Sequence, residues 1–290
     1  MPINKSVLII INPFSGVGRK QEIEACAEKI LQDFDITFRY TKYAKHAVEI
    51  SRNGVRDDFD IIVAVGGDGS VNEIGSQLIN TKTSLAIIPT GSGNGLARCL
   101  GIPLNPEEAF KTIANNKSKL IDTGEINGVI FLGTAGIGFD AHIGHLFEKK
   151  KVRGFFSYLP LIFKSYFSYN PQMFNIQLDN KDSFQSKAWL LTFSNSNQWG
   201  NNAYISPESD LYDGYFNLII LKKPKISQIP KLAFQLFKGN ILKSTLIQSH
   251  LFKEAKIEHQ LNVFHVDGES VENTTTLNID INPQSLKVIS

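Results

Sequence analysis

The chain has 290 residues, of which 42% are hydrophobic and 20% are charged, a balance typical of globular proteins and unlike that of disordered or collagen-like chains. Its length predicts one large domain or two smaller ones. The formal net charge of +2 argues against a dedicated nucleic-acid binder with a strongly basic face.

Two cysteines, Cys26 and Cys99, are too few for a disulfide framework or a zinc ribbon, so we expect free thiols in a reducing compartment. The first residues, Met1 to Lys5, lack the layout of a signal peptide. No stretch reaches the roughly 18–20 uninterrupted apolar residues of a spanning helix. We therefore expect a cytoplasmic protein, able to sit peripherally at the inner face of the membrane.

The first 125 residues alternate between β-branched runs and longer amphipathic stretches. The runs predict strands at residues 6–11, 36–40, 60–65, 85–88 and 120–121. The stretches predict helices at residues 19–34, 44–53 (closed by Gly54), 70–78 and 107–115. Strands that alternate with helices indicate βαβ units and a parallel sheet.

From about Gly124 onward the chain consists of short strand-like runs separated by turn residues. We expect strands at residues 129–132, 174–178, 188–193, 216–221, 256–261, 277–281 and 286–289, and helices at about 141–168 and 226–244. Asn-Gly, Asp-Asn and Asp-Gly pairs suit tight hairpins. The sequence therefore predicts a Rossmann-like α/β N-terminal domain (1–124) and a β-rich antiparallel sandwich C-terminal domain (125–290), whose last strand can pack back on the first domain.

A glycine-rich segment follows one predicted strand and opens the next helix. It comprises Gly66, Gly67, Asp68, Gly69, Ser70, Val71 and Asn72. Glycines let the backbone approach a ligand closely, and the N–H groups of a helix N-terminus attract phosphate. A carboxylate beside such a loop is suited to organising Mg²⁺.

Two further polar turns follow neighbouring predicted strands. One contains Asn12, Pro13, Phe14, Ser15 and Gly16, and the other runs from Pro89 to Gly95 and includes Ser92. Because open α/β sheets bind ligands at the carboxyl ends of their strands, we expect the three loops to converge on a nucleotide.

The sequence does not support other common nucleotide-binding or metal-binding motifs. The chain has no G-x-x-x-x-G-K-[ST] motif. A near match to the dinucleotide fingerprint at Gly136 to Ala141 lies beyond the βαβ region, so we interpret it as unrelated to a cofactor. His142 and His145 lack other metal-type ligands nearby, so we interpret them as packed or solvated side chains.

At this point the motifs resemble the diacylglycerol kinase catalytic-domain family, which includes bacterial soluble lipid kinases, sphingosine kinases and ceramide kinases. Six blocks match in order through nearly the whole chain: the three loops, Thr41, residues 121–124, residues 206–214 and residues 266–269. The resemblance implies an ATP-dependent lipid kinase that works in a cleft between two domains and transfers the γ-phosphate of Mg-ATP to the hydroxyl of a lipid such as diacylglycerol.

The resemblance also implies roles for individual residues. ATP would contact the three loops together with Thr41 and Ser92. Mg²⁺ would be held by the Asp213 side chain and the carbonyls of Asp210 and Tyr215, while Asp68, Asp122 and Asp267 would form an acidic network. Glu269 would be the general base, with Asp267 beside it in the same catalytic motif.

The second glycine loop departs from many bacterial members, which carry an aspartate where this chain has Gly95. That form is closer to the sphingosine kinases, so a sphingoid-base kinase is an alternative. An NAD kinase-like enzyme, which also uses a Gly-Gly-Asp-Gly loop, and a non-catalytic regulator that binds nucleotide or lipid are less favoured.

The charge is unevenly distributed along the chain. Residues 149–256 carry 15 basic and 6 acidic residues, a net of +9, and the remainder carries −7. This segment contains both predicted helices of the second half, in which lysines accompany aromatic residues. Such a composition suits an anionic membrane surface, although helices that simply cover a sheet explain it equally well. We expect a lipid substrate and no nucleic acid, and a homodimer is compatible with the sequence.

Overall fold

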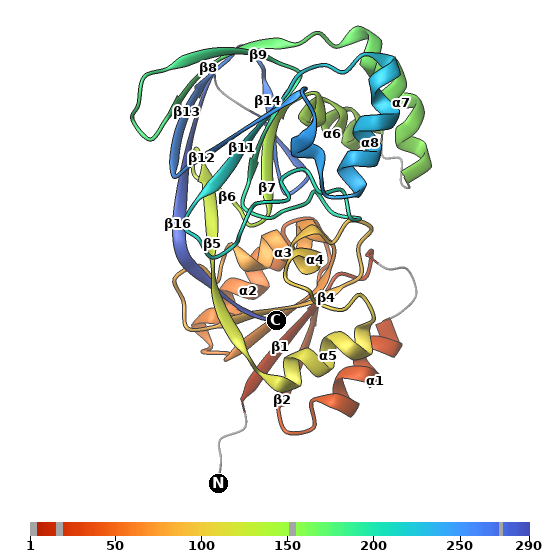
Figure 1. The fold of residues 1–290 in the computed structure, drawn as a ribbon. Coiled ribbons are helices and arrows are strands. Elements are labelled where there is room, and N and C mark those ends of the chain that lie inside the picture. The colour runs from red at the N-terminus through yellow and green to blue at the C-terminus, as the bar shows by residue number, and fades with distance from the viewer. Residues whose placement is uncertain (1–4, 16–19, 151–154, 273–274) are drawn as a thin grey trace. The chain divides into compact units, whose positions relative to one another are not determined.

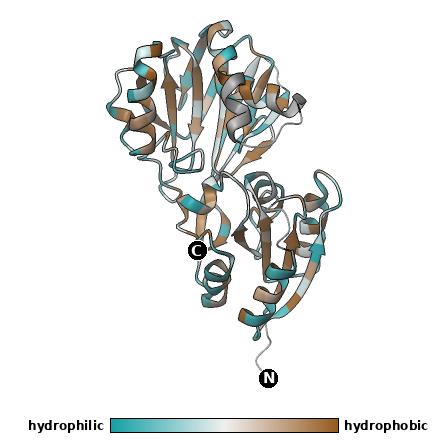
Figure 2. Cartoon of the chain, turned by 90° about the vertical axis from the view of Figure 1, so that its right-hand side faces the viewer, coloured by the Kyte–Doolittle hydropathy of each residue, from teal (hydrophilic) through white to brown (hydrophobic). Residues whose placement is uncertain are grey.

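The computed structural model describes residues 5–15, 20–150, 155–272 and 275–290. The chain divides into two compact units, which Figure 1 draws in one ribbon. The first unit contains residues 1–123, 200–202 and 282–290, and the second contains residues 124–199 and 203–281. The strands of both units are mostly hydrophobic, whereas the helices carry hydrophilic and hydrophobic segments (Figure 2).

A parallel sheet forms the centre of the first unit, in the order β2-β1-β3-β4. Its strands are β1 (Ser6–Ile11), β2 (Asp35–Tyr40), β3 (Ile61–Gly66) and β4 (Ser84–Pro89). Every residue of β3 and β4 is buried, because a parallel sheet is covered on both faces by its crossover helices. The α/β fold predicted for this half is confirmed.

Among the described residues, the helices that accompany the sheet are α1 (Lys20–Ile30), α2 (His46–Arg56), α3 (Asp68–Gly75), α4 (Gly95–Cys99) and α5 (Pro106–Asn115). Helix α1 packs with α5, and α2 packs with α3 (Figure 1). Right-handed crossovers on either side of β1 place these two pairs on opposite faces.

Helix α2 differs from the sequence prediction, which ended it before Gly54. The helix continues to Arg56, and Gly54 lies inside it. A Cβ atom at Gly54 would come within 2.5 Å of Leu8 Cδ2 and 2.9 Å of Ile62 Cδ1. The glycine therefore lets the helix approach β1 and β3 closely and does not terminate it.

The second unit is a sandwich of antiparallel strands, as predicted. One sheet has the order β12-β11-β10-β7-β14-β15, and in the other β13 pairs with β8 and with β16, and β8 with β9. The first sheet comprises β7 (Thr134–Gly138), β10 (Leu190–Ser194), β11 (Phe216–Leu221), β12 (Ile247–Phe252), β14 (Val263–Val266) and β15 (Glu269–Glu272). The others are β5 (Ser118–Ile126), β6 (Val129–Phe131), β8 (Gln172–Leu178), β9 (Phe184–Ala188), β13 (Glu254–Glu258) and β16 (Thr276–Ile289).

Phenylalanines dominate the core between the two layers of this sandwich. Phe131, Phe216 and Phe252 are fully buried, and the rings of Phe131 and Phe216 lie 5.2 Å apart between centroids. Each fully buried ring of this size stabilises the fold by about 1.5–3 kcal/mol. The core therefore gives the second unit a rigid base for the turns at its strand ends.

Strand β16 is one strand of 14 residues, where the sequence predicted two. Its first half pairs with β13, from Glu254 opposite Asp280 to Glu258 opposite Thr276. Near its end, Val288 pairs with Leu85 of β4 in the first unit's sheet.

Helices cover the outer face of the six-stranded sheet in the second unit. The predicted helix at 141–168 is two helices, α6 (Phe139–Lys150) and α7 (Phe155–Ser168), and residues 151–154 between them lie outside the described residues. The predicted helix at 226–244 is α8 (Ile229–Phe237) flanked by short 3₁₀ turns, η1 (Ile226–Gln228) and η2 (Ile241–Lys243). No helix in the described part of the chain is both long and apolar enough to cross a membrane.

Candidate active site

Three loops at the ends of β1, β3 and β4 are joined to one another in the first unit, as the sequence predicted. Asn12 Nδ2 donates a hydrogen bond of 3.1 Å to Ser70 Oγ, which ties the first loop to α3. The hydroxyls of Ser15 and Thr90 are 3.0 Å apart and tie the first loop to the one after β4. The polar groups of all three loops therefore gather at one edge of the parallel sheet.

The close approach of the loops explains their glycines. A Cβ atom at Gly66 would come within 2.4 Å of Ser70 Cβ, and one at Gly91 would come within 2.5 Å of Gly67 Cα. Side chains at these positions would therefore separate the loops. Helix α3 begins at Asp68, so its first N–H groups lie at this edge and give it positive potential.

Asp68 and Asn94 fix the shape of the loop after β4. Asn94 has a left-handed backbone (φ 52°), and its side-chain amide both accepts from the Gly91 N–H and donates to the Gly91 carbonyl. Asp68 Oδ1 accepts a hydrogen bond of 2.7 Å from the Gly95 N–H. Gly95 is thus bonded through its backbone to an acid of the other glycine loop.

The remaining predicted ATP contacts differ in exposure. Pro13, Phe14 and Ser92 are exposed, and Gly69 and Asn72 are partly exposed near the start of α3. Val71 and Thr41 are buried; Thr41, at the end of β2, donates its N–H to the Ile11 carbonyl. Gly16 lies outside the described residues.

Asp122, on strand β5, is fully buried. Its Oδ1 accepts a hydrogen bond of 2.7 Å from the N–H of Gln284, whose backbone is left-handed (φ 47°). The carboxylate therefore stabilises a local bend in β16. Its part in an acidic network with Asp68 and Asp267 stays a prediction.

In the second unit, the residues predicted for catalysis lie on a two-residue hairpin between β14 and β15. Asp267 (φ 46°) and Gly268 (φ 89°) both have positive φ, as a type I′ turn requires. Val266 pairs with Glu269 across the turn, and Glu269 is exposed as the first residue of β15. The predicted base is therefore an accessible carboxylate on a short, well-defined turn.

Asp267 binds the backbone around the start of β7. Its Oδ2 accepts from the N–H of Leu132 at 2.8 Å, and its Oδ1 accepts from those of Gly133 and Thr134 at 2.8 and 3.0 Å. Three N–H donors stabilise a charged carboxylate strongly. Asp267 thus anchors the hairpin that carries Glu269. The family resemblance placed Asp267 beside the base and did not predict this structural role.

The predicted metal residues lie on one loop that precedes β11. Asp210 Oδ1 accepts from the Tyr212 N–H at 3.1 Å, and Asp213 Oδ1 accepts from the Tyr215 N–H at 2.9 Å. Both acids are exposed, and Gly214 (φ 74°) permits the second turn.

Buried polar side chains in and next to this loop are joined by hydrogen bonds. Asn217 Nδ2 donates to Ser209 Oγ at 2.9 Å, and Ser209 Oγ donates to Ser206 Oγ at 2.8 Å. Among the described residues, no three His, Cys, Asp or Glu side chains group as metal ligands. A carboxylate with two backbone carbonyls is nevertheless an all-oxygen donor set, which fits Mg²⁺.

A pair of side chains next to the hairpin between β14 and β15 was not predicted from the sequence, and it joins the buried His265 to the partly buried Asp140. His265 Nε2 and Asp140 Oδ2 are 3.0 Å apart, and a Cβ at Gly136 would come within 2.7 Å of both atoms. Burial and the nearby Asp140 raise the pKa of the Tyr169 hydroxyl. Gly136, one of the glycines that resemble a dinucleotide fingerprint, therefore serves packing, because it makes room for this pair.

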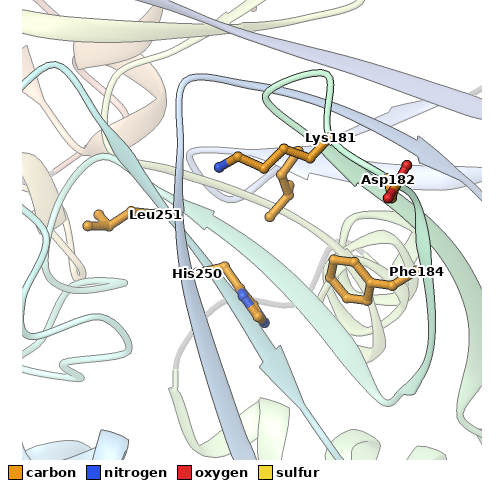
Figure 3. Close-up of a pocket in the computed structure, with 6 residues that line it drawn as sticks. Lys181, Asp182, Phe184, His250 and Leu251 are labelled. Carbon is orange, nitrogen blue, oxygen red and sulfur yellow. The ribbon is translucent and has the colours of Figure 1, made fainter.

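A pocket of about 240 Å³ lies elsewhere in the second unit, on strands β8, β9 and β12 and the loop between β8 and β9 (Figure 3). Its lining includes Lys181, Phe184 and His250, and the rings of Phe184 and His250 lie 5.5 Å apart between centroids. None of the predicted site residues lines it.

Comparison with known proteins agrees with these motifs. The diacylglycerol kinase catalytic domain matches residues 6–126, and the YegS C-terminal NAD kinase beta sandwich-like domain matches residues 133–290. A diacylglycerol kinase of Bacillus subtilis is 30% identical over 242 residues, which cover 81% of this chain and 80% of that protein. A Pseudomonas aeruginosa protein named "Probable lipid kinase YegS-like" is 25% identical and covers 99% of this chain and 95% of its own.

Solved structures share the fold. A diacylglycerol kinase from Bacillus anthracis superposes with a TM-score of 0.79 at 24% identity, over 100% of this chain and 98% of that one. An NAD kinase from Archaeoglobus fulgidus in complex with ATP superposes with a TM-score of 0.56 at 14% identity, over 98% of this chain and 93% of that one. The fold and sequence define a phosphotransferase with an alcohol group as acceptor. The chain belongs to the diacylglycerol kinase family of lipid kinases.

Proposed function

We propose that the protein transfers the γ-phosphate of Mg-ATP to the hydroxyl of a lipid such as diacylglycerol. The observation that carries the proposal is the junction of three loops in the first unit, where Asn12 bonds Ser70, Ser15 bonds Thr90 and Asp68 bonds Gly95. Phosphoryl transfer depends mostly on positioning and on neutralising the charge of the phosphate oxygens, and this edge of the sheet suits both.

The first unit would bind the nucleotide. The N–H groups at the start of α3 would receive phosphate oxygens, and the glycines at 66, 67 and 91 leave the backbone open to close approach. Ser92 and Phe14 are exposed and can contact the nucleotide directly. Thr41 is buried behind the first loop, so its contribution would be mainly to the shape of the site.

The second unit would supply the base and the metal ligands. Glu269, exposed beside the turn, would take the proton of the lipid hydroxyl as that oxygen attacks the γ-phosphorus, and ADP would leave. The carboxylate of Asp213 and the carbonyls of Asp210 and Tyr215 would hold Mg²⁺, which neutralises charge on the phosphates. Asp68, Asp122 and Asp267 would complete the surrounding acidic network.

The test is a kinase assay on purified protein with γ-labelled ATP, Mg²⁺ and a panel containing diacylglycerol, a sphingoid base, phosphatidylglycerol and NAD⁺. We expect label in diacylglycerol. Glu269→Gln should lower kcat by about 10²–10⁴. Glu272→Gln is the matched control, because Glu272 is exposed on the same strand and should retain activity.

The panel also separates the alternatives. Label in the sphingoid base with none in diacylglycerol would favour the second lipid class, in line with Gly95. Label in NAD⁺ alone would make the protein an NAD kinase-like enzyme and overturn the proposal. Full activity of Glu269→Gln would remove the assigned base.

An exposed aromatic face on α7 and α8 supports contact with an anionic membrane. Phe163 and Phe167 of α7 are 67% and 56% exposed, and Phe234 and Phe237 of α8 are 62% and 51% exposed. Residues 222–243 carry six lysines and no acid. Each basic residue near an anionic surface is worth about 1 kcal/mol, and aromatic side chains can enter the headgroup boundary.

Vesicle sedimentation tests this contact. We expect the protein to bind vesicles that contain phosphatidylglycerol and to bind pure phosphatidylcholine weakly. The double variant Phe234→Ser/Phe237→Ser should lose binding. The control Leu251→Ser removes a residue that is 58% exposed on β12, outside these helices, and should bind as the wild type does. Equal binding by both variants would contradict the assignment of the face.

A further inference from the structure

The carbonyl of Gly93, in the loop after β4, accepts hydrogen bonds from two donors. Arg98 Nε donates at 3.1 Å, and the backbone N–H of Asn201 donates at 2.9 Å. The same guanidinium donates through Nη1 to Asn202 Oδ1 at 2.9 Å. Arg98 therefore joins the glycine loop to a segment more than one hundred residues further along the chain, within the same unit.

The segment from Gly200 to Asn202 has a backbone shaped for this contact. Its three residues have φ of 110°, 51° and 61°, all positive. A Cβ at Gly200 would come within 2.9 Å of the carbonyl carbon of Gly93. Only glycine allows so close an approach with that backbone, so the contact is built into the sequence.

The loop after β4 requires contacts from outside the loop to order its backbone at Gly93. Glycine-rich backbone loses much conformational entropy when it is ordered. Asn94 bonds back to Gly91 and so fixes one part of the loop, but Gly93 has no side chain of its own. Arg98 and the 200–202 segment together hold its carbonyl. We call this arrangement the brace.

We propose that Arg98 is a positioning residue for nucleotide binding: with the 200–202 segment, it keeps the loop after β4 in the shape that receives ATP. The inference rests on the proposed function, in which this loop contacts ATP. Arginine suits the role because its planar fork reaches two acceptors at once, which a lysine ammonium on a flexible stem does less well.

Three variants test the brace in the full chain. Arg98→Lys keeps the charge and loses the fork. Asn202→Gly removes the side-chain acceptor and tolerates the left-handed backbone. Asn116→Gly is the matched control, because Asn116 is a left-handed asparagine (φ 50°) at the end of α5 in the same unit and outside the site.

We expect the first two variants to raise the Kd and KM for ATP by about tenfold, as the loss of a hydrogen bond to a charged group predicts. The KM for lipid and the Tm should stay at wild-type values, and Asn116→Gly should bind ATP normally. A merely structural role would lower Tm and leave the affinity for ATP unchanged. Wild-type ATP affinity in Arg98→Lys would show that charge alone suffices and would overturn the inference.

Hydrogen exchange on the nucleotide-free protein separates this inference from the proposed function. The amide of Asn201, bonded to the Gly93 carbonyl, should exchange faster in Arg98→Lys and Asn202→Gly than in the wild type or Asn116→Gly. If the wild type fails to bind ATP, the proposed function fails, and exchange still decides whether the brace exists. Unchanged exchange in both variants would overturn the brace.

Discussion

Asp68 Oδ1 accepts a hydrogen bond of 2.7 Å from the N–H of Gly95, so an acid of the first glycine loop holds the backbone at the end of the second. Asp68 and Gly95 are 27 residues apart in the chain, and their bond links the two loops. The backbone at Gly95 contributes this donor to Asp68. The bond gives Asp68 a role in shaping the site as well as its predicted place near the metal.

Replacing Asp68 should therefore weaken nucleotide binding. Asp68→Ala leaves the Gly95 N–H without this acceptor, so we expect the KM for ATP to rise by about tenfold. Asp68→Asn keeps an oxygen acceptor and should affect the KM less. Steady-state kinetics at saturating lipid would measure both. Asp33→Asn, at an exposed acid of the same unit, is the control. An unchanged KM in Asp68→Ala would show that the bond is not needed for ATP binding.

Asp267→Asn should destabilise the fold. The carboxylate accepts from three N–H groups, and an asparagine would turn its NH₂ toward one or more of these donors. We expect unfolding to become easier by about 3 kcal/mol, since donors to a charged group are left unsatisfied. Urea denaturation followed by circular dichroism measures this. Glu269→Gln, which changes an exposed side chain, should unfold as the wild type does; equal stability of the two variants would contradict the anchoring role.

The Gly136 packing predicts a second effect on stability. An alanine Cβ would meet Asp140 Oδ2 and His265 Nε2 at 2.7 Å and the Leu191 carbonyl at 2.8 Å. Overpacking of this kind costs about 1–3 kcal/mol, and the backbone contact cannot relax cheaply. We expect Gly136→Ala to lower Tm. Gly128→Ala is an unsuitable control because Gly128 has positive φ, so Gly144→Ala, at a Cβ distance of 3.6 Å from Ser270 Oγ, serves instead and should be nearly neutral.

Local signals were enough to predict where the three loops lie in the first unit. The glycines at 66, 67 and 91 follow strand runs directly, and the parallel sheet then brings the loops to one edge. The Asp267-Gly268 pair predicted a tight hairpin, and its two positive φ angles confirm it. These features depend on short stretches of chain, whose geometry the residue types largely determine.

Other contacts could not be predicted because they join distant parts of the chain. His265 lies 125 residues from Asp140, and Arg98 lies 104 residues from Asn202. The helix predicted to end at Gly54 continues because the glycine packs against Leu8 and Ile62, which only the tertiary structure reveals. At Gly54, packing overrides the local propensity of glycine to end a helix.

Stability should fall in mildly acidic solution because of His259. This side chain is 6% exposed, and burial lowers its pKa to about 4, while its Nδ1 accepts the Leu261 N–H at 3.0 Å. In the unfolded chain a histidine titrates near pH 6.5, so between these two values the unfolded state binds a proton that the native state does not. The contribution of neutral His259 is therefore present above about pH 6.5 and is lost as pH falls toward 4.

Comparison with His259→Asn isolates this effect from the other titrating groups. The asparagine oxygen can accept the Leu261 N–H and does not titrate. We expect the difference in unfolding free energy, wild type minus variant, to fall by about 2 kcal/mol between about pH 7.5 and about pH 5. Urea denaturation at both pH values measures it. A difference that does not change with pH would mean that burial does not lower the pKa of His259 in the native state.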